Sequence, residues 1–253
     1  MKVTFLGTGT SQGIPVIGSQ HPVCLSSNPK DKRLRVSVLV EWDNAAYVID
    51  CGPDFRYQML RAGCAKLDGI IFTHEHSDHV AGIDDIRPFV FRQGDMPFYA
   101  HRRVLDAFRI RFAYIFDTEN KYPGAPSVKT IEITDEPFVI SGLKVVPINV
   151  QHNTLDIFGF RFNDFAYITD AKRIVASEIE KLKGVKALVI NALREKPHES
   201  HFNLEDALEF IQLVDPERAY LTHISHLLGF HDEVQQKLPD NVYLAYDNLV
   251  ITL

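Results

Sequence analysis

Four apolar segments of this chain end in a histidine or an aspartate. They read IIFTH, INVQH, AYITD and AYLTH, and the residues that close them are His74, His152, Asp170 and His223. Short apolar runs of this kind predict β-strands. Polar side chains at the carboxyl ends of strands can converge on one edge of a sheet, where short loops carry the chemistry. The fold is therefore expected to bring segments from both halves of the chain to a common edge.

The first of these segments continues into a dense group of metal-ligand side chains. Residues 70–82 read IIFTHEHSDHVAG, and within them lie His74, His76, Asp78 and His79. Neutral imidazole and carboxylate groups are the ligands that Zn²⁺ and related divalent cations take in proteins. The spacing predicts a metal site immediately after a buried strand.

Strand and helix signals alternate along the chain without a linker or an internal repeat. Strands are predicted over residues 3–7, 35–42, 45–52, 69–74, 129–133, 138–152, 158–164, 165–170, 185–192, 218–223 and 242–253. Helices are predicted over residues 56–64, 102–116, 177–184 and 204–214. Gly63 lies at the end of the first helix, and Asn203 with Asp206 resembles a capping box at the start of the last. With 45% hydrophobic residues, we expect residues 1–253 to form one α/β domain.

Charge and composition exclude several classes of function. The formal net charge of −6 and the lack of a long basic run argue against nucleic-acid binding by phosphate neutralisation. No apolar run approaches the length of a membrane span, and MKVTFLGTGTSQG does not have the pattern of a secretion signal. Cys24, Cys51 and Cys64 are too few for a disulfide framework, so we expect reduced thiols in a cytoplasmic protein. GTGTSQG lacks the lysine of a P-loop and is interpreted as a turn bordering the site.

Taken together, these features resemble the metallo-β-lactamase superfamily, whose H-x-H-x-D-H signature is present at residues 74–79. The resemblance implies a four-layer αββα sandwich with two mixed sheets flanked by helices. It also implies two divalent metal ions. The first would be held by His74, His76 and His152, the second by Asp78, His79 and His223, and Asp170 would bridge them. Zinc is the metal we expect, although such sites also accept Mn²⁺ or Fe²⁺.

Three further residues, Asp50, Glu75 and Ser77, lie near the expected ligands in the sequence or in the superfamily fold. In the superfamily, Asp50 would accept a hydrogen bond from a ligand imidazole, which fixes the tautomer of that ring. The alternative is that Asp50 only forms a turn with Cys51 and Gly52. Glu75 and Ser77 lie between ligands, and we expect them to face away from the metals.

Several stretches narrow the resemblance over essentially the whole chain. FLGTGTSQGIPVIG, GIDDIRPF, NALREKPHESHFNLEDAL and AYLTHISH are similar to the branch that contains the phosphoribosyl cyclic phosphodiesterase of phosphonate breakdown. This implies a phosphodiesterase that hydrolyses a small, cyclic phosphate ester with a hydroxide shared by the two metals. His201 and the metal ligand Asp78 are the catalytic residues expected.

His201 is expected to contact the scissile phosphate and to assist the leaving oxygen. An imidazole with a pKa near 6.5 can donate a proton at working pH. The alternative is that His201 merely precedes a helix. His198 and Arg194 are surface residues or further phosphate contacts.

Other functions remain open from the sequence. A transfer-RNA 3′-processing endoribonuclease shares the ligands, but residues 84–127 carry no Gly/Pro-rich or basic arm for RNA. A thioester or lactone hydrolase uses the same metals and fits the His201 region poorly. The fourth reading is a metal-binding protein without catalysis. The partner expected is a small phosphorylated substrate, without a membrane, and a homodimer is compatible with the sequence.

The stretch GSQHPVCLSS departs from the pattern of this branch. Relatives often have C-x-C-P-x-C here, which holds a structural zinc together with a later histidine. In this chain His21, Cys24 and His226 would be the ligands that remain, and Ser19 would stand at the fourth position, where a hydroxyl is a poor substitute. Either a weakened zinc site is retained, or packing around Pro15 and Pro22 holds a loop with one buried thiol.

Overall fold

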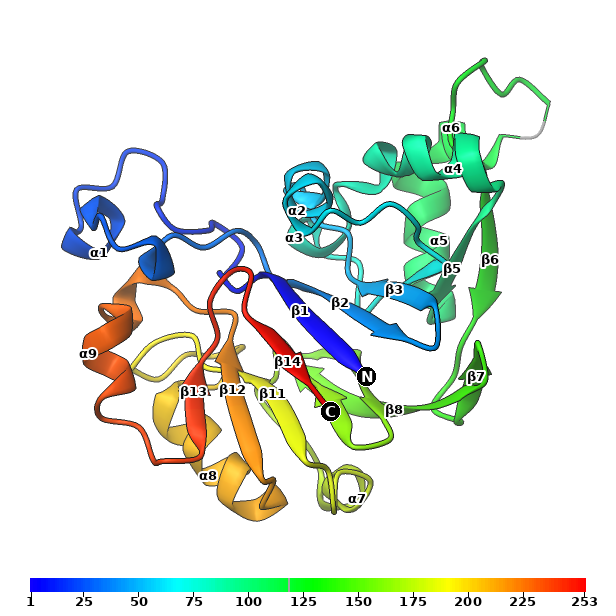
Figure 1. The fold of residues 1–253 in the computed structure, drawn as a ribbon. Helices are drawn as coiled ribbons and strands as arrows, with labels where there is room; N and C mark the ends of the chain where they lie inside the picture. The colour runs from blue at the N-terminus through cyan, green and yellow to red at the C-terminus, as the bar shows by residue number, and fades with distance from the viewer. Residues whose placement is uncertain (118) are drawn as a thin grey trace.

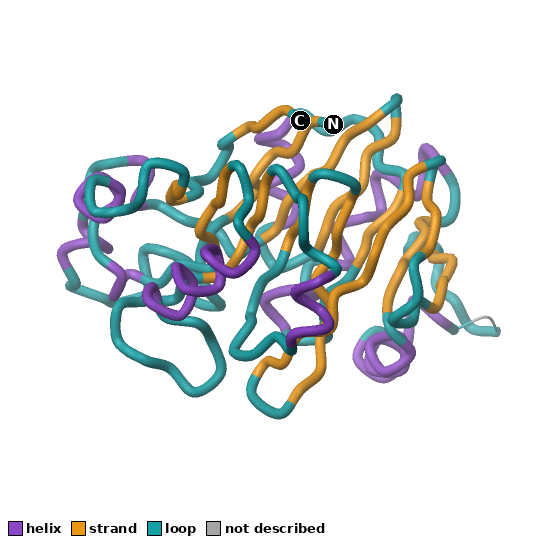
Figure 2. Tube along the Cα trace, turned by 90° about the horizontal axis from the view of Figure 1, so that it is seen from below, coloured by secondary structure: helices purple, strands orange, loops and turns teal. Residues whose placement is uncertain are grey.

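Two mixed sheets run through the computed structural model, which describes residues 1–117 and 119–253 (Figure 1). In spatial order, the first sheet consists of β14 (Val250–Thr252), β1 (Lys2–Gly7), β2 (Ser37–Trp42), β3 (Ala45–Ile49), β4 (Gly69–Ile71), β5 (Met96–Ala100) and β6 (Val128–Glu132). The second consists of β13 (Val242–Leu244), β12 (Arg218–Thr222), β11 (Ala187–Asn191), β10 (Phe165–Tyr167), β9 (Leu155–Phe162), β8 (Leu143–His152) and β7 (Phe138–Ile140). Figure 2 shows the strands between outer helices, with the two chain ends side by side.

Helices lie along the first sheet, along the second sheet and in the connecting loops. The first group is α2 (Phe55–Ala62), α3 (Ser77–Val80), α4 (Arg87–Gln93), α5 (Arg102–Arg111) and α6 (Ala113–Phe116). The others are α1 (Pro22–Leu25), α7 (Ala176–Glu180), α8 (Leu204–Val214) and α9 (His231–Gln235). Single 3₁₀ turns cover Pro29–Asp31, Ile83–Ile86 and His226–Leu228.

Three apolar clusters fill the spaces between these layers. The central cluster joins the inner faces of the two sheets, with Phe5 of β1 and Phe160 of β9 among its members. A second packs α8 through Phe210 onto the second sheet. A third places Phe55 of α2 and Phe108 of α5 against the first sheet. The order helix, sheet, sheet, helix confirms the predicted four-layer αββα sandwich.

The predicted helix ends are confirmed where the signal lies within a few neighbouring residues. The capping box of α8 is present, because the Asp206 amide donates to Asn203 Oδ1 at 3.0 Å and the Asn203 amide donates to Asp206 Oδ2 at 3.3 Å. Gly63 ends α2 with a φ of 63°, in the left-handed region that glycine adopts without steric cost.

Three predicted elements each form two elements in the structure. Residues 138–152 form the hairpin of β7 and β8, because the chain turns at Ser141 and Gly142, where φ is positive. Residues 102–116 form two helices, because the backbone leaves the helical region at Phe112. Residues 242–253 form β13 and β14, which belong to different sheets. Asp247 fixes this crossing, since its carboxylate accepts from the Leu34 amide at 2.9 Å and from the Thr8 hydroxyl at 2.8 Å.

None of the helices in residues 1–117 and 119–253 combines the length and the apolar character needed to cross a bilayer.

Candidate metal centre

The four polar residues that close the apolar segments lie at one edge of the two sheets. His152 is the last residue of β8, and His223 directly follows β12. His74 and Asp170 each lie three residues beyond the end of their strands, β4 and β10. The GTGTSQG segment borders this edge, because the Thr10 amide donates to the Ile224 carbonyl at 3.0 Å and the Ile224 amide donates to the Thr8 carbonyl at 2.9 Å.

Ligand atoms gather here in three overlapping groups, within each of which they lie no more than 4.8 Å apart. The groups are His74, His76 and His152; Asp78, His79, Asp170 and His223; and His152, Asp170 and His201. The structure thus brings together all seven residues predicted as ligands. The first two groups contain the residues expected to hold the first and the second ion, and Asp170 belongs to the second and the third.

Hydrogen bonds at Nδ1 orient three of the imidazoles. His152 Nδ1 donates to the Ser200 carbonyl at 2.8 Å, and His79 Nδ1 donates to the Asp50 carboxylate at 2.7 Å. The single hydroxyl proton of Thr73 goes to Asp50 at 2.8 Å, so His74 Nδ1 is the donor in its 2.9 Å contact with Thr73 Oγ1. With the proton on Nδ1, the Nε2 lone pair of each ring is free for a cation.

Asp50 occupies the position predicted from the resemblance. It is fully buried, and besides His79 and the Thr73 hydroxyl it accepts the Thr73 amide at 2.9 Å. Burial raises the pKa of Asp50, although the neighbouring His79 and the Thr73 donors oppose that rise. One carboxylate therefore orients two imidazoles of the cluster, that of His79 directly and that of His74 through Thr73.

The carboxylates of Asp78 and Asp170 face the remaining imidazole nitrogens. Asp170 places Oδ2 3.3 Å from His79 Nε2 and Oδ1 3.1 Å from His223 Nε2. Asp78 Oδ2 lies 3.3 Å from His79 Nε2. Asp50, Asp170 and His223 all have a positive φ, between 53° and 63°. Backbone strain of this kind is found at functional sites, where the surrounding structure holds it in place.

The electrostatics of the cluster favour a positive charge at its centre. Burial alone would lower the pKa of His79, yet Asp170, Asp78 and Asp50 raise it well above its ordinary value. Burial would raise the pKa of Asp170, yet His223 and His79 hold it well below its usual range. Burial and the charge of His79 keep His74 neutral by lowering its pKa. A proton on His79 or a divalent cation can supply the charge that the carboxylates require.

The donor set fits divalent metal ions. Nε2 of His74, His79 and His223 is buried in each case and has no hydrogen-bond partner among the described residues. Unpaired buried polar atoms are costly, and coordination of a cation removes that cost. Imidazole nitrogens with carboxylates in this proportion are a zinc-type donor set.

His201 lies against the ligands and is 9% exposed. Its ring stacks on His223 at 4.8 Å, and its Nδ1 lies 3.7 Å from Asp170 Oδ1. The neighbouring residues fix it, since Ser200 accepts from His152 and the Phe202 amide donates to the Ala171 carbonyl. Burial and the neighbouring His223 lower the pKa of His201 to about 3, below the ordinary value expected from the sequence.

A polar cleft of about 500 Å³ lies next to His201 and is lined by Asn153, Arg194, Pro197, His198, Glu199 and Ser200. The Ser200 amide donates to His198 Nδ1 at 3.2 Å, which leaves the proton of a neutral ring on Nε2. Arg194 donates from Nε and Nη2 to the carbonyls of Lys196 and Pro197. Its Nη1 is therefore available to an anion.

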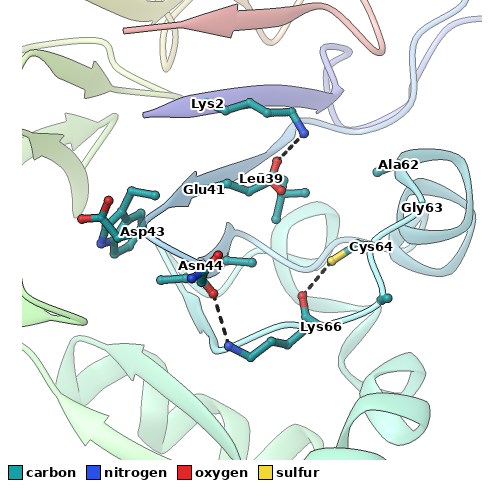
Figure 3. A pocket seen from close by; sticks show the side chains of 13 residues that line it. Lys2, Leu39, Glu41, Asp43, Asn44, Ala62, Gly63, Cys64 and Lys66 are labelled. Atoms are coloured by element: carbon teal, nitrogen blue, oxygen red, sulfur yellow. Dashed lines mark hydrogen bonds and ion pairs between the residues drawn. The ribbon is translucent and has the colours of Figure 1, made fainter.

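A second cavity, of about 480 Å³, lies around the turn between β2 and β3 (Figure 3). This is the opposite end of β3 from Asp50. Lys2 pairs with Glu41 at 2.8 Å and Lys66 with Asp68 at 2.7 Å, and burial raises the pKa of the Cys64 thiol. The lining offers neither an activated nucleophile nor an unpaired lysine, so we assign no chemistry to this cavity.

The predicted structural zinc site is only partly assembled. The rings of His21 and His226 meet edge to face at 4.9 Å. Cys24 does not join them in a group of three ligand atoms within 4.8 Å of one another anywhere in residues 1–117 and 119–253. It packs instead with Ile14 and Val23 in a small apolar cluster. This arrangement favours the alternative of a packed loop with one buried thiol.

Replacing Cys24 tests that choice. We expect Cys24→Ser to leave the metal content unchanged and to destabilise the protein by about 1–2 kcal/mol, because a hydroxyl would be buried among apolar side chains. Metal analysis and thermal unfolding measure the two effects. Release of one metal equivalent from Cys24→Ser would show instead that the loop holds zinc.

Sequence reasoning missed the residues that support the ligands. The Asn191 amide group clamps Ala171, next to Asp170, by accepting from its amide at 2.7 Å and donating to its carbonyl at 3.0 Å. Thr73 connects His74 with Asp50. Asn191 and Thr73 are both polar residues at or near the ends of strands. That position was the one feature of the sequence that could have indicated their supporting role.

Comparison with known proteins places the chain in a family. Residues 46–224, which include all seven ligand-type residues, match the model of the beta-lactamase superfamily domain. The crystal structure of a diphosphatase from the PhnP family superimposes with a TM-score of 0.93 at 38% sequence identity, covering 100% of this chain and 97% of that one. Zn²⁺-bound PqqB from Methylobacterium extorquens has a TM-score of 0.82 at 17% identity over both whole chains and shares the fold.

Two curated relatives are longer than this chain. An octanoyltransferase of Porphyromonas gingivalis is 41% identical over 252 residues, which is 98% of this chain and 51% of that protein. A ribonuclease Z of Enterococcus faecalis is 27% identical over 192 residues, which is 73% of this chain and 54% of that protein. The matched regions are therefore about half of each relative.

Proposed function

The chain belongs to the metallo-β-lactamase superfamily and is a metal-dependent hydrolase, and we propose that it cleaves a small, cyclic phosphate diester within a single domain of residues 1–253. The observation that supports this proposal is the position of His201. Its imidazole lies beside Asp170, and beyond it opens a cleft with arginine and histidine donors. Similarity to a diphosphatase of the PhnP family supports a phosphorylated substrate.

We assign one divalent cation to His74, His76 and His152 and a second to Asp78, His79 and His223, with Asp170 shared and zinc as the metal. Such a pair of cations acts as a Lewis acid on phosphoryl oxygens and lowers the pKa of water toward neutrality. The protein contributes the geometry. Asp50, Thr73 and the Ser200 carbonyl hold three imidazoles with Nε2 toward the centre.

His201 is assigned to the leaving oxygen. In the free site its imidazole is neutral, because its pKa is about 3, so it can donate a hydrogen bond but carries no extra proton. A phosphate ester brings negative charge next to this ring, and a nearby negative charge raises the pKa of an imidazole. His201 can then protonate or hydrogen-bond the departing alkoxide.

The cleft accommodates the rest of the substrate. Arg194 Nη1 and His198 Nε2 are free donors, and an arginine recognises phosphate oxygens through charge-assisted hydrogen bonds. Glu199 also lines the cleft, but it is exposed, so solvent screens its charge. A small phosphorylated molecule fits these features.

Two other substrates have a specific observation in their favour. Similarity to ribonuclease Z favours an RNA phosphodiester, and similarity to an octanoyltransferase favours an acyl thioester. The net charge of −6 weighs against RNA. The octanoyltransferase is about twice the length of the matched region, so its name describes a larger protein.

A panel of substrates separates these candidates. We expect kcat/KM for bis(p-nitrophenyl) phosphate and for a small cyclic phosphodiester to exceed that for an octanoyl thioester, a lactone and a precursor transfer RNA by roughly 10²-fold. Such a ratio corresponds to about 2.7 kcal/mol of differential transition-state stabilisation. Initial rates with the metal-replete protein measure it. Faster turnover of the thioester or of the RNA would overturn the proposal in favour of that substrate.

A further inference from the structure

Among the seven ligand-type residues, His76 alone is exposed. It directly precedes α3, and its side chain makes no capping hydrogen bond to that helix. His74 and His152, the other members of its group, are buried. An exposed side chain on a short connection loses conformational entropy when it binds a metal, unless its backbone is already fixed.

Arg111, the last residue of α5, donates hydrogen bonds to the residues on both sides of His76, to the backbone of one and the side chain of the other. Its Nη1 donates to the Glu75 carbonyl, and its Nη2 donates to the Ser77 hydroxyl at 2.7 Å. The residue before His76 and the residue after it are therefore bound to one planar guanidinium. The Ser77 side chain points toward this arginine, and the Glu75 carboxylate points toward Arg103 of the same helix.

Arg103, at the other end of α5, holds the same segment. Its Nε lies 3.2 Å from Glu75 Oε1, and its Nη2 donates to the Asp156 carbonyl of β9 at 2.8 Å. The Glu75 carboxylate is thus tied to a helix that is itself tied to the second sheet. Both groups in this ion pair are no more than about a third exposed, at 34% for Arg103 and 20% for Glu75.

The helix that carries both arginines is firmly packed against the strand that leads to the ligands. Phe108 of α5 meets Phe72 edge to face at 4.8 Å, and Phe72 lies two residues before His74. Val104 and Leu105 are buried in the same cluster. A rigid support of this kind lets hydrogen bonds from the helix determine where residues 75–77 lie.

We propose that Arg111, assisted by Arg103, is a positioning residue that holds His76 ready for the cation shared with His74 and His152. The proposal rests on the metal binding described under the proposed function, but it does not depend on the substrate. Residues that support metal ligands typically change metal affinity by 10- to 100-fold when they are removed. Loss of the Arg111 hydrogen bonds to Glu75 and Ser77 should lower the affinity for one ion by a factor of that size and change the affinity for the other ion little.

The test measures metal affinity without any substrate. Zn²⁺ is titrated into metal-free protein in competition with a chromophoric chelator, for the wild type and for Arg111→Ala. We expect one of the two ions to bind roughly 10- to 100-fold more weakly and the other to bind as in the wild type. Ser77→Ala removes only the hydrogen bond between Arg111 and the Ser77 hydroxyl. This variant should weaken binding of the same ion by a smaller factor.

Arg109→Ala is the matched control. Arg109 is an exposed residue of the same helix. Its guanidinium donates to Asp106 of that helix at 2.7 Å and not to the residues that flank His76. We expect wild-type affinity for both ions in this variant. Arg111→Lys keeps the positive charge but cannot bracket two acceptors with a planar group, so it should remain weakened.

Each outcome has a distinct meaning. Wild-type affinity in Arg111→Ala, or full restoration in Arg111→Lys, would overturn the positioning role while leaving the proposed function intact. Equal weakening in Arg109→Ala would overturn it as well, because the effect would then belong to the helix in general. A wild-type protein that binds fewer than two ions would contradict the proposed function itself.

Discussion

Asp170→Asn is expected to lower kcat for a phosphodiester by roughly 10³-fold or more and to reduce the bound metal from two ions per chain. The loss of one preorganised electrostatic group alone costs about 10²- to 10³-fold. Asp170 does more than such a group, because its two oxygens lie 3.3 Å from His79 Nε2 and 3.1 Å from His223 Nε2. Without the carboxylate, the negative charge between the two proposed ion positions disappears.

The choice of asparagine separates charge from backbone conformation. Asp170 has a φ of 57°, and asparagine tolerates this left-handed conformation better than alanine does. Asp215 provides a matched control, because it is exposed and has a φ of 55° at the end of α8. Asp215→Asn should keep two ions and full activity. Two tightly bound ions in Asp170→Asn, measured by metal analysis, would show that this carboxylate is not a shared ligand.

The sequence was sufficient to predict which histidines and aspartates lie close together, because the signal is simple. Apolar strands that end in His or Asp must place those side chains at a sheet edge, and the edge is common to strands of the same direction. His152 ends β8, and Asp170 and His223 follow β10 and β12 of the same sheet, whereas His74 follows β4 of the other sheet. A pattern of this kind survives uncertainty of two or three residues in each strand boundary.

The sequence was insufficient to predict a strand where its local signals disagree with the sheet that forms. β5 was missed because Pro97 stands within MPFYA, and proline in a run argues against a central strand. In the structure β5 pairs in parallel with β4 and β6. Residues 242–253 contain no turn signal strong enough to divide them, and the division depends on Asp247 reaching Thr8 and Leu34 at the other end of the chain.

Long-range support of the site could not be predicted either. Arg111 stands on an amphipathic helix whose exposed arginines look alike in the sequence, and the contact with Ser77 spans 34 positions. Protonation states could not be predicted from the sequence either, because they also depend on long-range contacts. The pKa of His201 depends on burial and on His223, neither of which a sequence pattern displays.

His201→Ala is expected to lower kcat for an alkyl phosphodiester by roughly 10²-fold or more, the usual scale for the loss of a general acid. Metal content should remain at the wild-type value, because Asp170 and the imidazoles of the other groups remain in place. His201 also forms a group of ligand atoms with His152 and Asp170. Loss of an ion in His201→Ala would therefore contradict the catalytic assignment and make His201 a ligand.

The leaving group distinguishes proton transfer from simple binding of phosphate. A p-nitrophenolate departs without protonation, whereas an alkoxide needs a proton, so His201→Ala should harm the alkyl ester far more than the nitrophenyl ester. His201→Gln refines the comparison, because its amide can donate a hydrogen bond but cannot supply a proton. If protonation matters, His201→Gln should be as slow as His201→Ala on the alkyl ester. Equal losses on both esters, with recovery in His201→Gln, would show that the neutral ring only binds the phosphate, consistent with its pKa of about 3 in the free site.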